Sequence, residues 1–416
     1  MEKALSVIIV TDKIKKDNWA AEDIIAEFGE LVTSSRIRQD DRVVCNLKDI
    51  SPAFLLGKGK IDEIRRLSEE LNVDVVVFSE NLSGTQQKNI EGALGIKTID
   101  RTQLILDIFA RRARSGEGKI QVELAQLEYL MPRLSGKGIL LSRLGGGIGT
   151  RGPGEQKLEV DRRRIAARIN KLKKELSAIA KQRTMRRKKR ERFSMLTIAI
   201  IGYTNAGKST LLNVLTGSDI LVDNMLFSTL DPTIRKYTLP TNQNVLFIDT
   251  VGFIYKLPHN LIDAFKATLE EVAEADILLH LLDMSHPKIR EQNEATYKVL
   301  EELDIKGKPI ITVLNKSDRV EDPATRKRLL KYFTDAINIS ALRRDNIDEL
   351  IDRITLHLGS LTTFIKVKIP MDDMKSVHLI YKLGKVVKRV DEGASIYIEA
   401  QVPQRVMQKL NLYQQI

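Results

Sequence analysis

The sequence has very little cysteine and few aromatic residues. Among its 416 residues it has one cysteine, Cys45, and one tryptophan, and aromatic residues make up only 5%. A single cysteine excludes an intrachain disulfide and favours an intracellular compartment, so we expect Cys45 only to fill core space. No apolar run approaches the ~20 residues of a membrane span, and residues 1–10 are too short for a signal peptide. We therefore expect a cytoplasmic protein.

The composition is that of a globular protein with an excess of positive charge. Apolar residues make up 43% of a chain long enough for two or three domains, and the formal net charge is +12. Such an excess favours a polyanionic partner, and its distribution along the chain decides more than its total.

A phosphate-binding pattern lies near the middle of the chain. The run GYTNAGKS at residues 202–209 fits G-x-x-x-x-G-K-[ST] and follows the apolar residues 196–201, which gives the strand, turn and helix that this pattern requires. In that setting backbone N–H groups surround phosphate oxygens, Lys208 reaches the β- and γ-phosphates, and the Ser209 hydroxyl ligates Mg²⁺. An ordinary tight turn would fit this run alone, but it would not explain the four stretches that accompany it.

Two of these stretches predict groups around the γ-phosphate. In DTVG at residues 249–252, Asp249 can hold Mg²⁺ through water and the Gly252 N–H can meet the γ-phosphate. In FSTLDPT at residues 227–233, Thr229 is suited to close over Mg²⁺ only when the γ-phosphate is present, and Thr233 is a second candidate.

The other two stretches predict recognition of guanine. In NKSD at residues 315–318, the Asp318 carboxylate can accept hydrogen bonds from guanine N1–H and the exocyclic amine. Adenine lacks these donors, so we expect the site to reject ATP. The run SAL at residues 340–342 fits the last base-contacting loop.

These motifs give a complete set of expected site residues. The expected catalytic residues are Lys208, Thr229 and Gly252, and the expected Mg²⁺ ligands are Ser209 and Thr229, with Asp249 through water. The expected nucleotide contacts are Gly202, Tyr203, Thr204, Asn205, Ala206, Gly207, Lys208, Ser209, Thr210, Phe227, Ser228, Thr229, Leu230, Asp231, Asp249, Thr250, Val251, Gly252, Asn315, Lys316, Ser317, Asp318, Ser340, Ala341 and Leu342. The five histidines have no metal-ligand spacing, so Mg²⁺ is the only metal we expect.

Phe253 follows the glycine of the second stretch. Ras-like GTPases carry a glutamine there that orients the attacking water, and a phenylalanine cannot hydrogen-bond a water molecule. We therefore predict slow intrinsic GTP hydrolysis that another side chain or a partner accelerates. The alternative is that Phe253 only packs in a core while a neighbouring polar group orients the water.

The excess positive charge is concentrated ahead of this region. Residues 162–192 contain fifteen Lys or Arg and two acids, and apolar residues recur every three or four positions from Ile165 to Ile179. This pattern predicts an amphipathic helix, for which residues 120–131 form an apolar mate. Residues 136–154, between the two helices, contain eight glycines interleaved with basic residues. A basic helical hairpin with a glycine-rich tip suits RNA, although a solvated face and a plain linker are the alternatives.

The whole chain is predicted to be α/β. We expect a P-loop GTPase domain at 193–360, preceded by a small α/β domain at 1–115 and the basic hairpin at 116–192, and followed by a small α+β module at 361–416. In the module, residues 363–369, 377–382 and 395–401 are expected to be strands, with a helix from Gln404. The run LGKGK at residues 56–60 could bind phosphate, although so short a glycine pair favours a plain turn at the start of a helix.

Long motifs give the chain a family resemblance. Residues 145–164, GGGIGTRGPGEQKLEVDRRR, residues 100–111, DRTQLILDIFAR, and the nucleotide stretches resemble the HflX family of ribosome-associated GTPases, within the Obg-HflX superfamily. Nothing from Thr363 onward carries such a motif. The resemblance implies that residues 1–192 form an HflX domain that binds the large (50S) ribosomal subunit, with the glycine-rich loop directed toward the peptidyl-transferase region of 23S rRNA. It also implies that the GTP-bound form splits 70S ribosomes under stress and that the large subunit stimulates hydrolysis.

Three other readings fit the sequence. They are a GTPase that assembles the large subunit, a regulatory switch that binds a protein effector, and an RNA remodeller that uses ATP at the N-terminal domain through residues 57–60. We expect a monomer when the protein is free, with GTP or GDP bound and no membrane span.

Overall fold

The chain divides into two compact units. The computed structural model describes residues 2–11, 19–47, 50–136, 153–192, 195–217, 225–227, 229–255 and 266–403, together with residues 406, 407, 410 and 413. Unit 1 comprises Met1–Ile179, Asp223–Asp231 and Lys256–Lys266, and unit 2 comprises Ala180–Val222, Pro232–Tyr255 and Ala267–Ile416. Each is built from helices and strands, and the predicted α/β fold class is confirmed. The predicted domain boundaries at 115, 192 and 360 stay predictions.

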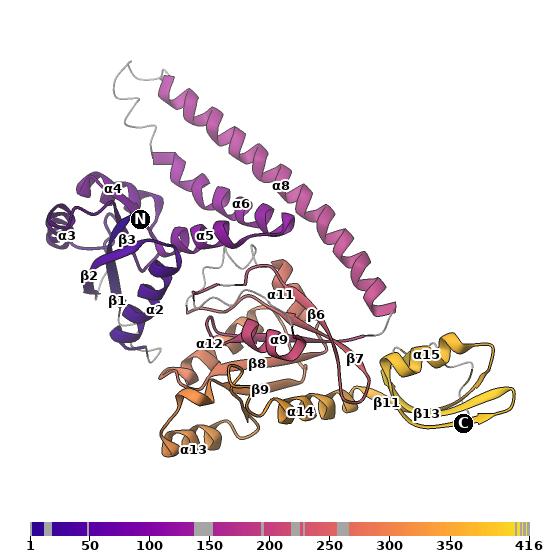
Figure 1. The fold of residues 1–416 in the computed structure, drawn as a ribbon. Helices are drawn as coiled ribbons and strands as arrows, with labels where there is room; N and C mark the ends of the chain where they lie inside the picture. The colour runs from indigo at the N-terminus through magenta and orange to yellow at the C-terminus, as the bar shows by residue number, and fades with distance from the viewer. Residues whose placement is uncertain are drawn as a thin grey trace. The chain divides into compact units, whose positions relative to one another are not determined.

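Unit 1 begins with a four-stranded parallel sheet in the order β2-β1-β3-β4. Both faces of the central strand β1 are buried, as expected for a parallel sheet covered by helices. Its residues Leu5, Val7 and Ile9 lie on one face and belong to one apolar cluster. Figure 1 shows α3 and α4 on one face and α2 and α5 on the other. The strands are β1 (Lys3–Thr11), β2 (Arg38–Leu47), β3 (Val75–Phe78) and β4 (Lys97–Ile99), and the helices are α2 (Ala21–Ser34), α3 (Lys58–Glu70), α4 (Gly84–Leu94) and α5 (Arg101–Arg112).

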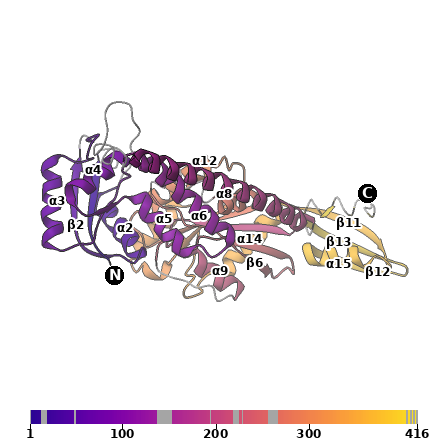
Figure 2. The same ribbon diagram turned by 90° about the horizontal axis from the view of Figure 1, so that it is seen from above.

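A helical hairpin follows this sheet, as the sequence predicts. It consists of α6 (Gly116–Leu130), the 3₁₀ helix η1 (Met131–Gly136) and α8 (Pro153–Arg192). Ion pairs from Arg168 to Glu123 at 2.7 Å and from Lys173 to Glu128 at 2.8 Å join the two long helices, which run side by side in Figures 1 and 2. At 1.5 Å per residue the 40 residues of α8 extend about 60 Å, so the helix is longer than its basic segment alone suggested.

Arg133 fixes the hairpin to the sheet of unit 1. Its guanidinium donates to Asp100 Oδ2 at 3.1 Å, Leu82 O at 2.6 Å and Tyr129 O at 2.8 Å. The Asp100 carboxylate is fully buried and also caps α5 by accepting from the Gln103 N–H. A buried carboxylate needs such partners, since an unpaired charge in the core is costly, so this network explains where the hairpin attaches.

Unit 2 contains a six-stranded sheet in the order β10-β9-β8-β5-β7-β6, in which only β6 runs antiparallel. Its strands are rich in buried Ile, Leu and Val, as expected for a sheet covered on both faces. The strands are β5 (Leu196–Gly202), β6 (Thr233–Thr238), β7 (Asn244–Asp249), β8 (Ile277–Asp283), β9 (Ile310–Asn315) and β10 (Ile337–Asn338). The helices are α9 (Lys208–Thr216), α11 (Lys266–Glu274), α12 (Ile289–Glu302), η2 (Ser317–Arg319), α13 (Pro323–Tyr332) and α14 (Ile347–Ser360).

The C-terminal module of unit 2 corrects one prediction. Residues 377–382, expected as a strand, lie in helix α15 (Met374–Leu383), because Val377, Ile380 and Leu383 are buried at helical spacing and Asp373 caps the helix. The missed strand is the charged, exposed β12 (Lys385–Glu392), which pairs with β13 (Ser395–Pro403) beside β11 (Thr362–Pro370). Helix α15 covers one face of this sheet (Figure 1). The helix predicted from Gln404 falls largely outside the described residues.

None of the helices among the described residues combines the length and apolar character needed to cross a bilayer. The cysteine expected to fill the core, Cys45, is buried in β2, and burial raises the pKa of its thiol.

Candidate functional site

The run GYTNAGKS forms the turn between β5 and α9. Gly202 has φ +146° and Gly207 has φ +94°, backbone conformations that side chains rarely adopt. A Cβ atom at Gly202 would collide with the Leu281 carbonyl of β8, and one at Gly207 would collide with the Asn315 amide. Both glycines are therefore required by the close approach of neighbouring strands, and the turn leads directly into the N-terminus of α9, where backbone N–H groups favour an anion.

Lys208 is the first residue of α9 and its ammonium group is buried in this turn. It donates to the Tyr203 carbonyl at 2.8 Å and the Gly202 carbonyl at 3.3 Å. Burial lowers the pKa of Lys208 to about 8, with Lys316 lowering it further and Asp249 opposing the shift. A bound polyphosphate would place negative charge next to this buried ammonium group and stabilise it, so Lys208 is suited to bind phosphate oxygens.

Ser209 and Asp249 bring two oxygen ligands together at the ends of α9 and β7. The Ser209 hydroxyl donates to Asp249 Oδ2 at 2.6 Å, and the carboxylate is fully buried. A hydroxyl and a carboxylate are hard oxygen donors of the kind that Mg²⁺ takes when it also binds phosphates. The residues therefore fit the ion expected from the sequence. Among the described residues, no cluster of three or more His, Cys, Asp or Glu could hold a metal by itself.

The DTVG stretch packs directly against the phosphate-binding turn. A Cβ atom at Gly252 would lie 2.7 Å from Thr204 Cα and 2.9 Å from Lys208 Nζ. The Thr250 hydroxyl donates to the Ile200 carbonyl at 2.6 Å, so that side chain holds the loop to β5. Only glycine fits at position 252, and its backbone lies next to the Lys208 ammonium group.

Phe253 is held by its backbone and buried through its ring. The Phe253 N–H donates to the Gly202 carbonyl at 3.1 Å, and its own carbonyl accepts from the Thr204 N–H at 2.7 Å. The side chain is 1% exposed. The ring therefore packs in the core and presents no hydrogen-bonding group to a water molecule at this position.

Asn315, the last residue of β9, joins the loops that follow β5 and β10. Its Nδ2 donates to the Ala206 carbonyl at 2.8 Å, and its Oδ1 accepts from the Ala341 N–H at 2.9 Å. The polar atoms of this side chain thus hold the phosphate-binding turn and the SAL loop together. This arrangement gives Asn315 a structural role, and the contact with the nucleotide predicted from sequence stays a prediction.

Asp318 lies partly exposed beside the same loop. Its Oδ1 accepts from the Ser340 hydroxyl at 2.6 Å, which orients the carboxylate. Lys316, with φ +62°, pairs with Asp283 Oδ2 at 2.8 Å. Asp283 was not among the residues predicted from the sequence, although it ends the apolar strand β8 as Asp249 ends β7.

Four of the five predicted stretches therefore meet in unit 2, around β5, β7, β9 and β10. Of the fifth stretch, Phe227, Thr229, Leu230 and Asp231 are assigned to unit 1, Thr233 lies in β6 of unit 2, and Ser228 is outside the described residues. The carboxylate of Asp231 is engaged by helix α6. The nucleotide contact expected of Asp231 stays a prediction.

The basic helix α8, called here the basic arm, has fewer unpaired cations than its sequence suggests. Several of its cations have carboxylate partners within the described chain; these are Arg163, Arg164, Arg168, Lys171, Lys173 and Arg183. Such pairs are weak at an exposed surface, and Arg162 and Lys174 form no ion pair with any described residue. The arm therefore remains a positively charged surface.

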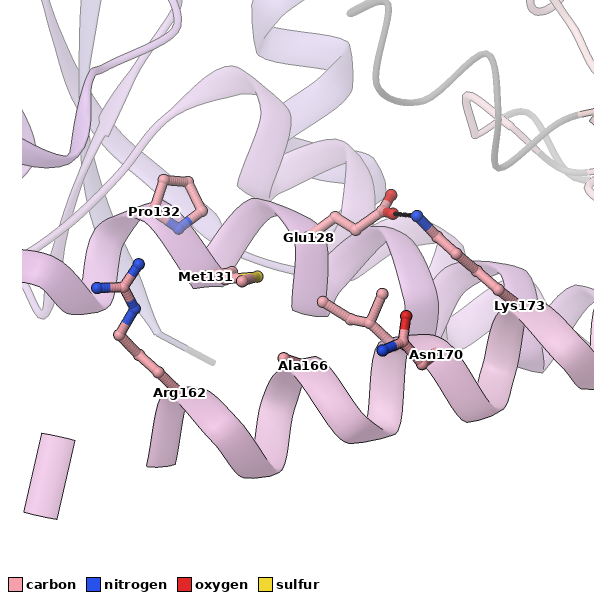
Figure 3. A pocket seen from close by; sticks show the side chains of 8 residues that line it. Glu128, Met131, Pro132, Arg162, Ala166, Asn170 and Lys173 are labelled. Carbon is pink, nitrogen blue, oxygen red and sulfur yellow. Dashed lines mark ion pairs between the residues drawn. The ribbon is translucent and has the colours of Figure 1, made fainter. Parts of the chain in front are cut away.

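A groove of about 470 Å³ lies between α8 and the α6–η1 segment of unit 1 (Figure 3). Met131, Pro132 and Ala166 give it apolar walls, and Arg162 projects from α8 near Pro132. The Glu128–Lys173 ion pair closes the other end. Apolar walls with a guanidinium group at the rim are the features on which an unstacked base can lie.

Two further sequence expectations have different outcomes. Residues 137–152 of the predicted glycine-rich tip lie outside the described residues. The LGKGK run is a turn that starts α3 at Lys58, and Lys60 pairs with Glu63 at 2.8 Å. A carboxylate beside this lysine disfavours a phosphate there.

Comparison with known proteins places these features in a context. Family models match residues 22–110 (GTP-binding GTPase N-terminal), 112–190 (GTP-binding GTPase Middle Region) and 197–316 (50S ribosome-binding GTPase). The chain is 43% identical to GTPase HflX of Caldanaerobacter subterraneus subsp. tengcongensis, over 98% of this chain and 93% of that protein. It is 38% identical to GTPase HflX of Escherichia coli, over 91% and 89% respectively. A crystal structure of a GTP-binding protein from Sulfolobus solfataricus in complex with GDP is 27% identical, covering 87% of this chain and 100% of that one, with a TM-score of 0.45.

Proposed function

The chain belongs to the GTPase HflX family, and from that premise we propose that its GTP-bound form binds the large ribosomal subunit and splits stalled 70S ribosomes under stress. It is a GTPase of a ribosome-binding class. We further propose that it works in the cytoplasm as a monomer, that its contacts are with 23S rRNA, and that the ribosome stimulates hydrolysis. The buried Phe253 carries the proposal that the ribosome stimulates hydrolysis, since a GTPase without a water-orienting side chain at that position needs outside help to hydrolyse GTP.

The site supports a division of labour among this chain's residues. Backbone N–H groups of the 202–209 turn and Lys208 would bind the phosphates, and the Gly252 N–H would respond to the γ-phosphate. Ser209, Asp249 and Thr229 would hold Mg²⁺, which when bound neutralises phosphate charge. Asp318 and residues 340–342 would select guanine. Since Phe253 cannot orient water, the GTP-bound form would persist until a ribosomal contact places the missing group.

The rival readings differ in observable ways. An assembly factor would bind large subunits without splitting 70S particles, and a switch with a protein effector would bind in a manner little affected by salt. An ATP-dependent remodeller would need the 57–60 turn, where Glu63 already pairs with Lys60. The unpaired cations of α8 favour a polyanionic partner over a protein effector.

Reversing the free charges of the arm should weaken binding to the large subunit. With Arg162→Glu and Lys174→Glu together, we expect at least a ~10-fold loss of affinity at moderate salt. The slope of log K against log salt should also be smaller in magnitude by about 1.5, because two phosphate contacts are lost. Co-sedimentation with purified 50S subunits over a salt series measures both.

The matched control changes the net charge equally on two helices of unit 2. Lys298→Glu on α12 and Lys327→Glu on α13 are exposed positions and should leave the slope unchanged. Equal losses in the two double variants would mean that only total charge matters, and the arm would then not be the RNA-binding surface.

A further inference from the structure

The described residues 225–227 and 229–231, which include Thr229, belong to unit 1. The Phe227 ring is 2% exposed, and its centroid lies 4.8 Å from that of Phe109 on α5 in an edge-to-face arrangement. The Leu226 N–H donates to the Ser34 hydroxyl at the end of α2, at 2.9 Å. These contacts anchor the segment just before Thr229.

A second anchor follows Thr229 at Asp231. Its carboxylate accepts from the Arg114 N–H at 2.9 Å, the Ser115 N–H at 2.8 Å and the Ser115 hydroxyl at 2.5 Å. Ser115 is the residue that caps α6, since its hydroxyl oxygen accepts from the Gly118 N–H at 2.8 Å. A negative charge at the start of a helix is favourable, so Asp231 and Ser115 form a shared cap.

Gly118 shows that this contact is built into the fold. A Cβ atom at that position would collide with Asp231 Oδ1. Gly118 lies inside a helix, where glycine is ordinarily unfavourable, and its φ is not in the left-handed region. The glycine therefore serves to make room for the carboxylate.

The two anchors leave little freedom to Thr229. It lies two residues from Phe227 and two from Asp231, so neither anchor can be more than about 7 Å of chain away. Phe227 has φ +57°, an uncommon conformation for a bulky residue, which its packing must stabilise. After Asp231 the chain enters β6, where Thr233 pairs with Asp249, the partner of Ser209.

We propose that Asp231 is a positioning residue for the GTP-bound state: by sharing the cap of α6 it ties the Thr229 segment to the N-terminal unit and presets Thr229 for the magnesium-bound triphosphate. The inference rests on the role proposed above for Thr229. If GTP binding requires an ordered Thr229, it also favours the hydrogen bonds between Asp231 and Ser115. This coupling is reciprocal, so the intact cap of α6 in turn favours GTP binding. GDP lacks the γ-phosphate, so we expect GDP binding to depend less on Thr229.

Nucleotide affinities of Asp231→Asn, Ser115→Ala and the double variant test the proposal. Each single variant should weaken binding of a non-hydrolysable GTP analogue about 5- to 10-fold, since one charged hydrogen-bond network is lost. The GDP affinity should stay within about twofold of the parent. The double variant should bind the GTP analogue no more weakly than the single variant with the lower affinity, because both changes remove the same contact.

A second readout follows the cap itself. Hydrogen exchange of the Ser115 and Gly118 amides should be slower with the GTP analogue than with GDP in the parent protein, and this difference should vanish in Asp231→Asn. Ser83→Ala is the matched control, because Ser83 caps α4 in the same unit by accepting from the Gln86 N–H and does not touch Asp231. It should lower thermal stability as Ser115→Ala does without separating GTP from GDP.

Several outcomes would overturn the proposal. Equal weakening of both nucleotides would make Asp231 merely structural, tighter binding of the GTP analogue would make the cap a restraint, and additive losses would show that Ser115 and Asp231 act separately. Thr229→Ala distinguishes a failure of this proposal from a failure of the proposed function. If that variant itself fails to separate GTP from GDP, the role of Thr229 in the proposed function fails.

Discussion

Replacing Asp318 by alanine is expected to lower GTP affinity by at least ~100-fold and to abolish the preference for GTP over ATP. The Ser340 hydroxyl orients the carboxylate at 2.6 Å, and guanine presents the two N–H donors that it can accept. Without the carboxylate those donors stay unpaired in the complex, while adenine loses nothing. Fluorescence titration with both nucleotides measures the ratio of the two affinities.

Asp322→Ala is the matched control for this change. Asp322 is a neighbouring aspartate that caps α13 by accepting from the Ala324 and Thr325 N–H groups. Its loss should slightly lower thermal stability with the GTP-to-ATP ratio unchanged. A preference for GTP that survives in Asp318→Ala would contradict the proposed base site.

Replacing Gly252 by alanine is expected to slow GTP hydrolysis by about 100-fold or more, the effect of losing one transition-state donor. A Cβ atom there would press on Thr204 Cα at 2.7 Å and on Lys208 Nζ at 2.9 Å, so the loop must shift and its N–H with it. Single-turnover hydrolysis at saturating GTP measures the chemical step.

Gly359→Ala provides the control for an added methyl group. It lies in α14, and nothing is within 4 Å of the Cβ atom it would gain. Hydrolysis should be unchanged and thermal stability slightly raised. If Gly252→Ala hydrolysed GTP within threefold of the parent, the 252 N–H would have no part in the reaction.

The meeting of four of the predicted stretches in unit 2 was predictable because each motif is local. A strand that ends in a glycine turn or an aspartate can be recognised within about eight residues of sequence. Parallel strands then bring those ends to one edge of the sheet. The roles of Asn315 and Asp283 were not legible, since their partners belong to other strands.

The C-terminal module shows the opposite case. A short run of apolar residues at 377–382 fits a strand or a helix, and only the burial of Val377, Ile380 and Leu383 against the sheet distinguishes them. Strand β12 is polar and exposed, so it has no apolar alternation to reveal it. Pairing between Asp231 and Ser115, which are far apart in sequence, also depends on tertiary structure that no local pattern encodes.

Light scattering of intact 70S ribosomes tests the central claim most directly. The protein is mixed with ribosomes at fixed salt together with GTP, a non-hydrolysable GTP analogue or GDP. We predict a fall in scattering with GTP and with the analogue but not with GDP, because the GTP-bound form splits the ribosome and hydrolysis serves release. Binding without a fall in scattering with any nucleotide would contradict the account and favour a role in assembling the large subunit.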